Sequence, residues 1–372
     1  ISGRPLDEAN PVLDTSLTLA NAMARVSAIQ PPLSPQGLAF SFRRHRSRPW
    51  TFPLFIENKM MNPLAAALMS FLIDGGRTIL FAGTRSSGKT SLLSAAIVEL
   101  MRSTRIITVE DTLELPITKY QDLNYDIQSM KVQSVITQGE AELTATDGIR
   151  TSLRLGDSAL IVGEVRSKEA VALYEAMRVG ALANVVMGTI HGDSPYSIYD
   201  RVVNDLGVQK TSFKATDIII VSNPVKSASG IGKLRRVIQI SEVRKEWEDD
   251  PLKEHGFVDL MVYNPKTDTL EPTDALIQGE SIVLKSIASR VAEWVGDWDA
   301  VWENIQLRAK IKEKIVELGK ENPEILEAEI TIQANDMFHR ISEDLFEKEG
   351  RSDPEKIYQE WEAWLTSKLS KL

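Results

Sequence analysis

Cysteine is absent from the 372 residues of this chain. Its absence excludes a disulfide framework and any metal site built from thiolates, and it suits a reducing compartment such as the cytoplasm. Long apolar runs are missing as well. No stretch reaches the roughly 18 residues that predict a membrane-spanning helix, and the most apolar candidate, residues 63–73, predicts a short buried helix instead.

Positive charge is also scarce. The chain has 43 Lys and Arg against 52 Asp and Glu, which gives a formal net charge of -9. Because general nucleic-acid binders usually carry a basic surface, this balance argues against that class. With 43% hydrophobic and 26% charged residues, the composition is that of a globular chain long enough for two or three domains.

The most informative stretch has the spacing G-x-x-x-x-G-K-[ST] and joins a predicted strand to a predicted helix. The strand is the apolar run 78–82, and the helix follows from residue 91 with apolar side chains at i, i+4 and i+8. This strand–loop–helix context distinguishes a phosphate-binding Walker A loop from a chance match in a turn. The residues predicted to bind nucleotide are Gly83, Thr84, Arg85, Ser86, Ser87, Gly88, Lys89, Thr90 and Ser91.

The residue types in this loop fit the chemistry of a polyphosphate. Backbone N–H groups at a helix N-terminus offer donors and a favourable dipole to an anion. Gly83 and Gly88 allow the chain to curl closely, Lys89 supplies a compact cation, and the Thr90 hydroxyl can coordinate Mg²⁺. ATP and Mg²⁺ are therefore the expected ligands.

Three further predicted strands end in polar residues. Glu110, Glu164 and His191 close these strands as Gly83 closes the first. Because strands alternate with helices here, the pattern predicts a mostly parallel sheet covered on both faces. Ligands of such sheets bind outside the carboxyl ends of the strands, so these four strand ends are expected to meet at one site.

Glu164 ends the apolar strand Ala-Leu-Ile-Val-Gly-Glu, which has the form of a Walker B box. Glu164 and Thr90 are the two residues predicted to bind Mg²⁺, and the carboxylate of Glu164 can orient the attacking water. Arg154 and Arg166 flank this strand, and either can pair with Glu164, with nucleotide or with a surface carboxylate.

Two other strand ends leave their roles open. Glu110 is followed by Asp111 and Glu114; one or two of these acids can assist at Mg²⁺ or water, or all three can be surface charge. His191 is a candidate sensor of the γ-phosphate, although a single histidine is more often structural. Glu110, Glu164, Arg166 and His191 are the predicted catalytic residues.

Taken together and in chain order, these boxes resemble the type II/type IV secretion ATPases, with features of the archaeal branch. The segment 107–115 resembles the aspartate box of that family, and 188–195 resembles its histidine box. Leu153 and Arg154, followed by Asp157 and the strand 160–166, look like the Walker B box. The resemblance covers about residues 20–240.

The resemblance implies an α/β fold: a RecA-like P-loop NTPase core (58–242), a partial α+β N-terminal domain with a hinge (1–57), and a C-terminal hairpin plus helical extension (243–372) outside the common core. It further implies a homohexameric ATPase at the inner face of the cell membrane, which works with a polytopic membrane platform protein in secretion or in pilus or flagellum assembly. Four arginines resemble N-domain arginines that approach nucleotide in the family. They are Arg43, Arg44, Arg46 and Arg48.

Two alternatives remain open at the level of the sequence. A nucleic-acid translocase of RecA-like type would share the P-loop, although the acidic composition argues against it. A nucleotide-binding scaffold would bind ATP without hydrolysing it.

Overall fold

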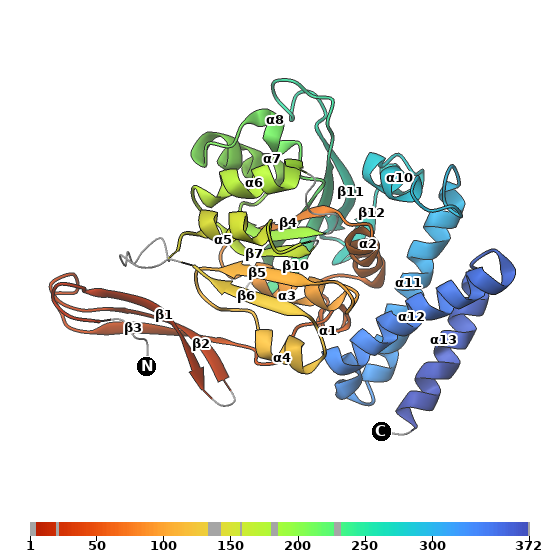
Figure 1. Cartoon of the computed structure of the whole chain (residues 1–372), viewed down its shortest axis with the longest axis horizontal. Coiled ribbons are helices and arrows are strands. Elements are labelled where there is room, and N and C mark those ends of the chain that lie inside the picture. Colours follow the sequence, from red (N-terminus) through yellow and green to blue (C-terminus); the bar gives the residue numbers. More distant parts are fainter. Residues whose placement is uncertain are drawn as a thin grey trace.

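The computed structural model consists of a small N-terminal sheet, a central α/β core and a group of C-terminal helices (Figure 1). It describes residues 5–19, 22–132, 143–156, 158–179, 185–226 and 232–370. Asp157 of the Walker B-like segment and Asn184, the predicted start of a strand, lie outside this part of the chain. No helix among the described residues is both long and apolar enough to cross a membrane.

The elements follow one another in two sets. The strands are β1 (Val12–Leu19), β2 (Ala22–Ile29), β3 (Ala39–His45), β4 (Thr78–Gly83), β5 (Ile106–Glu110), β6 (Ile127–Lys131), β7 (Ala159–Val165), β8 (Val186–His191), β9 (Ile218–Lys226), β10 (Lys233–Val243), β11 (Phe257–Asn264) and β12 (Thr269–Pro272). The α-helices are α1 (Phe52–Glu57), α2 (Pro63–Asp74), α3 (Lys89–Val98), α4 (Ile117–Asp122), α5 (Ala145–Ser152), α6 (Glu169–Val179), α7 (Pro195–Asp200), α8 (Lys210–Phe213), α9 (Asp274–Ile277), α10 (Ile282–Ala288), α11 (Trp298–Gly319), α12 (Ala328–Glu349) and α13 (Pro354–Leu369). A π-helical segment (Arg201–Asp205) and a 3-10 helix (Pro323–Leu326) complete the set.

The central sheet has the strand order β12-β11-β10-β9-β4-β8-β7-β5-β6. Its strands from β9 to β6 pair in parallel, and β9 to β12 continue as an antiparallel meander. The Walker strand β4 lies between β8 and β9, so Gly83 is opposite both His191 and Ser222. The predicted parallel sheet and the shared carboxyl edge are confirmed.

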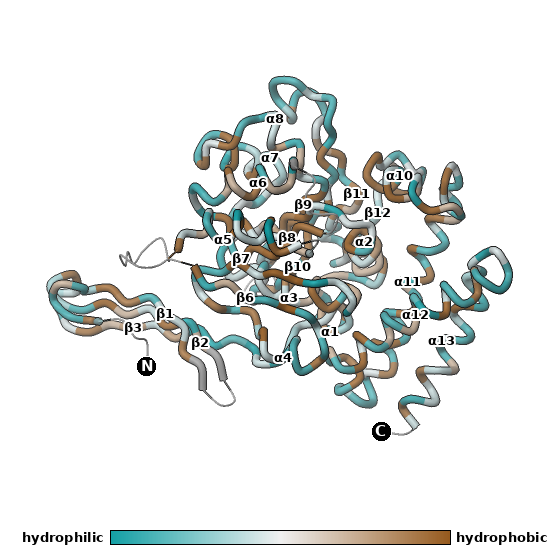
Figure 2. The backbone as a smooth tube through the Cα atoms, viewed as in Figure 1, coloured by the Kyte–Doolittle hydropathy of each residue, from teal (hydrophilic) through white to brown (hydrophobic). Residues whose placement is uncertain are grey.

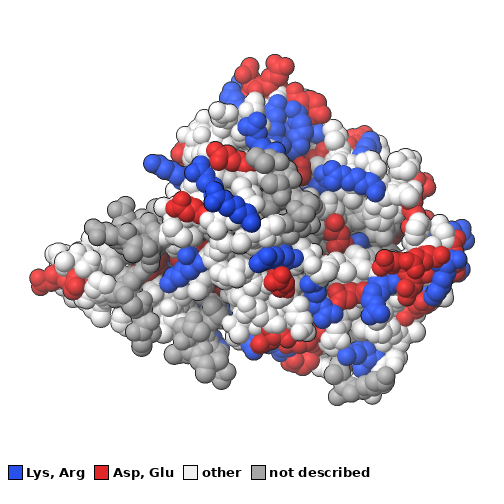
Figure 3. All heavy atoms as spheres, in the orientation of Figure 1, with Lys and Arg blue, Asp and Glu red and all other residues white. Residues whose placement is uncertain are grey.

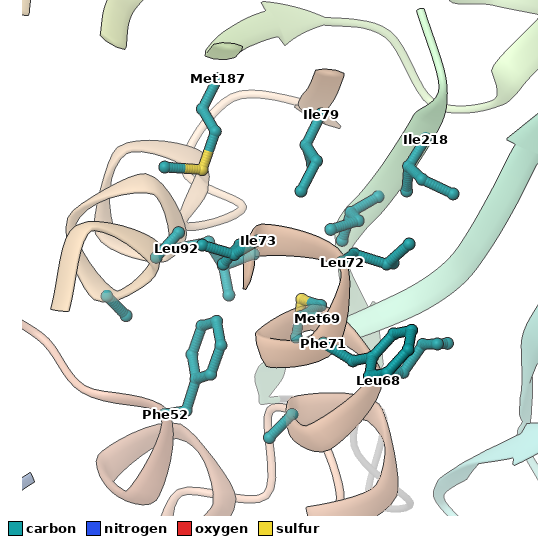
Figure 4. Close-up of a cluster of buried hydrophobic side chains, with 14 of the residues drawn as sticks. Phe52, Leu68, Met69, Phe71, Leu72, Ile73, Ile79, Leu92, Met187 and Ile218 are labelled. Carbon is teal, nitrogen blue, oxygen red and sulfur yellow. The ribbon is translucent and has the colours of Figure 1, made fainter. Parts of the chain in front are cut away.

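Alternate residues of β4 enter the two faces of a well-filled core. Ile79 and Phe81 pack against α2 and α3, whereas Leu80 and Ala82 pack on the side of α5 and α6. The apolar strands appear as the brown centre of the molecule in Figure 2. Figure 4 shows side chains of α1, α2 and α3 meeting those of β4, β8 and β9 in one cluster. This packing fixes the strand ends that carry the site.

The C-terminal helices form a third cluster of their own. Trp361 is fully buried in it and donates its indole N–H to the carbonyl of Ala334 at 3.0 Å. Four other tryptophans of the C-terminal region are partly buried against the hydrophobic clusters: Trp294, Trp298, Trp302 and Trp364. Figure 3 shows acidic and basic side chains interleaved on the face in view, densely so over these helices.

Several elements differ from the sequence-based expectation. The hairpin β11–β12, which was grouped with the C-terminal region, hydrogen-bonds to β10 and continues the core sheet. Helix α4 and the edge strand β6 were not among the predicted elements. Strand β10 was not predicted, because its charged first half (Lys233, Arg235, Arg236) obscures the apolar pattern. The predicted helical extension is interrupted, because α10 ends at Ala288 and turns lead from there to Gly296 at φ +76°.

Candidate nucleotide site

The Walker loop runs from the end of β4 to the start of α3, and both of its glycines are required by its shape. Gly83 has φ +155°, and a Cβ there would lie 2.1 Å from the carbonyl oxygen of Ser222. Gly88 is left-handed at φ +99° and immediately precedes α3. The loop therefore adopts the close curl that the sequence predicted.

Lys89 lies almost buried inside this loop, 8% exposed. Its ammonium donates to the carbonyls of Gly83 and Thr84, each at 3.0 Å, and lies 3.4 Å from Nδ1 of His191. Burial lowers the pKa of Lys89 to about 8; Arg43 acts in the same direction, while Glu164 opposes the shift. An incoming phosphate would favour the charged form.

His191 connects Lys89 to Glu164. Its Nε2 lies 2.9 Å from Oε1 of Glu164. Burial lowers the pKa of His191, and the neighbouring Lys89 cation lowers it further, so the ring is neutral at pH 7. Because an ammonium can only donate, we assign Nδ1 as the acceptor and place the ring proton on Nε2, toward Glu164.

Glu164 is held by an ion pair with Arg166, which also donates to Asp111 at 3.0 Å. Burial alone would raise the pKa of Glu164, but the hydrogen bond and charge of Arg166 outweigh it, and the pKa is lowered. The carboxylate is therefore ionised. Of the two predicted partners, Arg166 is the one that pairs with it, whereas Arg154 is exposed and contacts no site residue in the part of the chain described.

Glu110 and Glu114 have different positions. Glu110 is 2% exposed, and its Oε1 accepts from the backbone N–H groups of Glu114 and Leu115 at 3.0 and 3.2 Å. Burial raises its pKa to about 8. It does not line the cavity beside the loop, whereas Glu114 does. The structure thus places the predicted catalytic Glu110 beneath the loop 111–115.

A cavity of about 650 Å³ lies between the Walker loop and the N-terminal sheet. Charged side chains from both sides line it, among them Arg25 and Arg43 of the N-terminal sheet and Lys89, Glu164, Arg166 and His191 of the core. A second cavity, of about 600 Å³, adjoins it and shares Arg43, Ser86, Gly88, Thr90 and Glu114. Together they extend from the strand ends to Thr90 and Ser91 at the start of α3.

The four N-domain arginines separate into two pairs. Arg43 lines both cavities and Arg44 lines the second. Arg46 and Arg48 also reach the second cavity, but their guanidinium groups pair with glutamates of the C-terminal region. Arg43 is therefore the one of the four arginines that is best placed to approach a bound nucleotide. Arg25, which the sequence did not single out, joins the site through Glu114 at 3.3 Å.

Residues outside the recognised boxes support the loop. Asn223 Oδ1 accepts from the Thr84 N–H at 3.0 Å, and Arg235 donates to the Ser86 carbonyl at 2.8 Å. Thr189 donates to the carbonyl of Gly163 at 2.6 Å, which ties β8 to β7. Asn223 on β9 and Arg235 on β10 belong to none of these boxes, so the sequence motifs did not indicate these roles.

The donors present fit a magnesium ion that a nucleotide brings with it. No group of three or more His, Asp or Glu side chains among the described residues could cage a metal. Mg²⁺ is usually held by one or two protein oxygens together with phosphates and water. The ionised carboxylate of Glu164 and the hydroxyl-bearing Thr90 both line the cavity beside the Walker loop. These are the two residues predicted for the metal.

A Walker loop on a central parallel strand, with an acid and a histidine from neighbouring strand ends beside its lysine, defines a P-loop nucleotide-binding protein with a RecA-like core. The family model described as "Type II/IV secretion system protein" matches residues 15–229. The chain therefore belongs to the type II/IV secretion ATPase family.

The chain is also similar to individual proteins. A putative conjugal transfer protein of Mycobacterium tuberculosis is 29% identical over 54% of this chain and 56% of its own length, so the chain spans little more than half of that relative. The conjugal transfer protein TrbB of Rhizobium radiobacter is 26% identical over 64% of this chain and 69% of its own length. Among solved structures, the Legionella pneumophila ATPase DotB aligns with 14% identity, a TM-score of 0.49, and coverage of 78% and 74%.

Proposed function

We propose that this protein is a Mg²⁺-dependent ATPase that acts as a homohexameric ring motor and powers protein secretion or the assembly of a pilus- or flagellum-type filament. The observation that carries the proposal is the contact series from Lys89 through His191 to Glu164 and Arg166 at the edge of the parallel sheet. Family membership and relatives named for conjugal transfer and type IV secretion support the transport role.

The residues of the site have distinct tasks in this proposal. Backbone N–H groups of the Walker loop and the Lys89 ammonium bind the phosphates and neutralise their charge, which is the main requirement of phosphoryl transfer. Thr90 and Glu164 would hold Mg²⁺, which supplies charge neutralisation when bound. The ionised Glu164 orients the attacking water, and Arg166 keeps this carboxylate in place.

His191 is suited to couple the site to movement. It contacts the phosphate-binding Lys89 on one side and Glu164 on the other, so a change at the γ-phosphate alters both contacts of one ring. Arg43 and Arg25 face the same cavity from the N-terminal sheet. Closure of the sheet on the core would then follow nucleotide occupancy. The working location is the cytoplasmic membrane face, where a polytopic platform protein is the proposed partner.

The experiment compares the purified wild type with Lys89→Ala and Glu164→Gln. Lys89→Ala should lose ATP binding, because the buried cation of the loop is removed. Glu164→Gln should keep ATP binding while its turnover falls by about 10²–10⁴-fold, the usual contribution of a positioned acid–base group. Binding is measured by calorimetry and turnover by phosphate release. ATP binding without wild-type turnover would identify a scaffold, and DNA-stimulated, salt-sensitive turnover would identify a translocase.

A further inference from the structure

The linker between the N-terminal sheet and the core carries two arginines that point to the C-terminal helices. Arg46 and Arg48 lie between β3 and α1. Arg46 donates to the carbonyl of Pro49 at 2.6 Å, which folds the linker, and also pairs with Glu327. Arg48 pairs with Glu324 at 2.9 Å and with Glu329 at 2.9 Å. The linker is therefore held by residues about 280 positions further along the chain.

Glu327 is the shared partner at this contact. Its side chain is 10% exposed, and its two oxygens face Arg46 and the Nε of Arg48, the latter at 3.4 Å. Directly beside it, the buried Thr51 hydroxyl donates to the carbonyl of Leu326 at 2.5 Å. A carboxylate so enclosed depends on both guanidinium groups, because an uncompensated buried charge is strongly unfavourable.

The C-terminal helices are in turn fixed to the core. Lys312 of α11 pairs at 2.7 Å with Glu99, the residue that ends the Walker helix α3, and both side chains are 2% exposed or less. Arg102 pairs with Asp336 of α12, and Arg308 with Asp74 of α2. The glutamates that hold the linker thus belong to a unit that does not move freely relative to the Walker loop.

The N-terminal sheet has few other attachments. Among the described residues, no side chain of β1–β3 belongs to any of the three hydrophobic clusters. Figure 1 shows this sheet extending away from the core, while the linker leads from it toward the C-terminal helices. An ion pair joins Arg25 of this sheet to Glu114 of the core. The position of the sheet therefore depends largely on the linker.

We infer that Glu327 is a positioning residue: by holding Arg46 and Arg48, the C-terminal helical unit sets where Arg43 of the N-terminal sheet stands over the Walker loop. This inference rests on the proposed function and gives the C-terminal region a role in it. Arg43 lies on β3, only three residues before Arg46, so a change in the linker is passed directly to it. Glu327 itself touches no part of the nucleotide cavities.

The test combines kinetics with a distance measurement. Because the chain has no cysteine, spin labels attach only at cysteines introduced by mutation. Leu38, just before β3, and Leu252, in the connection between β10 and β11 of the α/β unit, are suitable sites because they are 59% and 62% exposed. Glu327→Gln should broaden the distance distribution between these labels and raise the KM for ATP about three- to tenfold, with kcat changed less than about twofold. Arg48→Ala, which alters the linker rather than the helices, should do the same if Glu327→Gln folds poorly.

Glu349→Gln is the matched control, since Glu349 ends the same helix and pairs with Lys356 far from the linker. It should leave both readouts unchanged. An unchanged distance distribution in both Glu327→Gln and Arg48→Ala would overturn the inference, and so would a changed distance with an unchanged KM. If the wild type shows no turnover, the proposed function fails, whereas the distances and the affinity for a fluorescent ATP analogue still test the positioning.

Discussion

At the scale of single residues, two glutamates at the ends of neighbouring strands lie in opposite electrostatic environments. Glu164 at the end of β7 is paired with Arg166 and its pKa is lowered. Glu110 at the end of β5 is buried without a cation, and its pKa is raised to about 8. Because the two pKa values are shifted in opposite directions, Glu164 is ionised at pH 7, whereas the carboxyl of Glu110 is neutral. Glu110 supports the loop 111–115 through its hydrogen bonds to the backbone, and its catalytic role stays a prediction.

Glu110 should make stability depend on pH. In the unfolded chain its carboxyl loses its proton near pH 4.5, whereas the folded protein keeps it until about pH 8. Between these values the folded state binds more protons, so stability falls as pH rises, by up to about 1.4 kcal/mol per pH unit. Glu110→Gln cannot titrate. In urea unfolding at pH 5, 6.5 and 8, the stability of the wild type should decline relative to this variant, and parallel pH profiles would contradict the assignment.

At the scale of elements, helix α3 has functional contacts at both ends. It begins with Lys89 in the Walker loop and is followed by Glu99, which pairs with Lys312 of α11. Because this pair is almost fully buried, each charge needs the other, although two apolar residues of similar size could replace both. The contact therefore fixes where the C-terminal helices attach to the nucleotide-binding core.

Removing one partner of this pair should be costly. Lys312→Ala leaves Glu99 buried without a cation, and the free energy of unfolding should fall by about 3–5 kcal/mol. The double replacement Lys312→Met with Glu99→Leu should recover most of this loss. Lys314→Ala is the control on the same helix, because its pairs are more exposed and contribute about 1 kcal/mol or less. If denaturant titrations gave the same loss of unfolding free energy for Lys312→Ala and Lys314→Ala, the importance of the buried pair would be refuted.

At the scale of the whole molecule, the N-terminal sheet is a single layer whose outer strand carries exposed aromatic side chains. Phe40 and Phe42 are 62% and 58% exposed and contact each other edge to face at 5.3 Å. Exposed apolar side chains on an uncovered sheet favour contact with another protein surface. This feature is consistent with the proposed ring, in which the sheet would lie against a neighbouring copy.

Assembly should depend on nucleotide. Light scattering with MgATP should give a mass near six times the 41.4 kDa of one chain, most clearly for Glu164→Gln, which should hold ATP without hydrolysing it. Without nucleotide the mass should be smaller. Phe40→Ser combined with Phe42→Ser should weaken the assembly while leaving ATP binding by the single chain intact. A single-chain mass under all conditions would contradict the ring.

Much of the site could be predicted because its signals are local. A glycine-bounded loop after an apolar strand and the polar ends of β7 and β8 are visible in short windows of sequence, and parallel pairing brings them together. The position of Glu110 could not be read in this way, because an acid at a strand end looks the same whether it enters the cavity or supports a loop. Contacts such as Arg46 with Glu327 depend on tertiary packing between distant segments and leave no periodic pattern.

The antiparallel meander β9–β12 has a practical consequence for protein engineering. The family match stops at residue 229, inside the connection between β9 and β10, yet Arg235 on β10 holds the Ser86 carbonyl and β11 and β12 complete the same sheet. A chimera joined at the end of the match would divide a hydrogen-bonded hairpin between two parents. Grafting a foreign C-terminal region onto this ATPase calls for a junction after Pro272, where the last strand of the sheet ends.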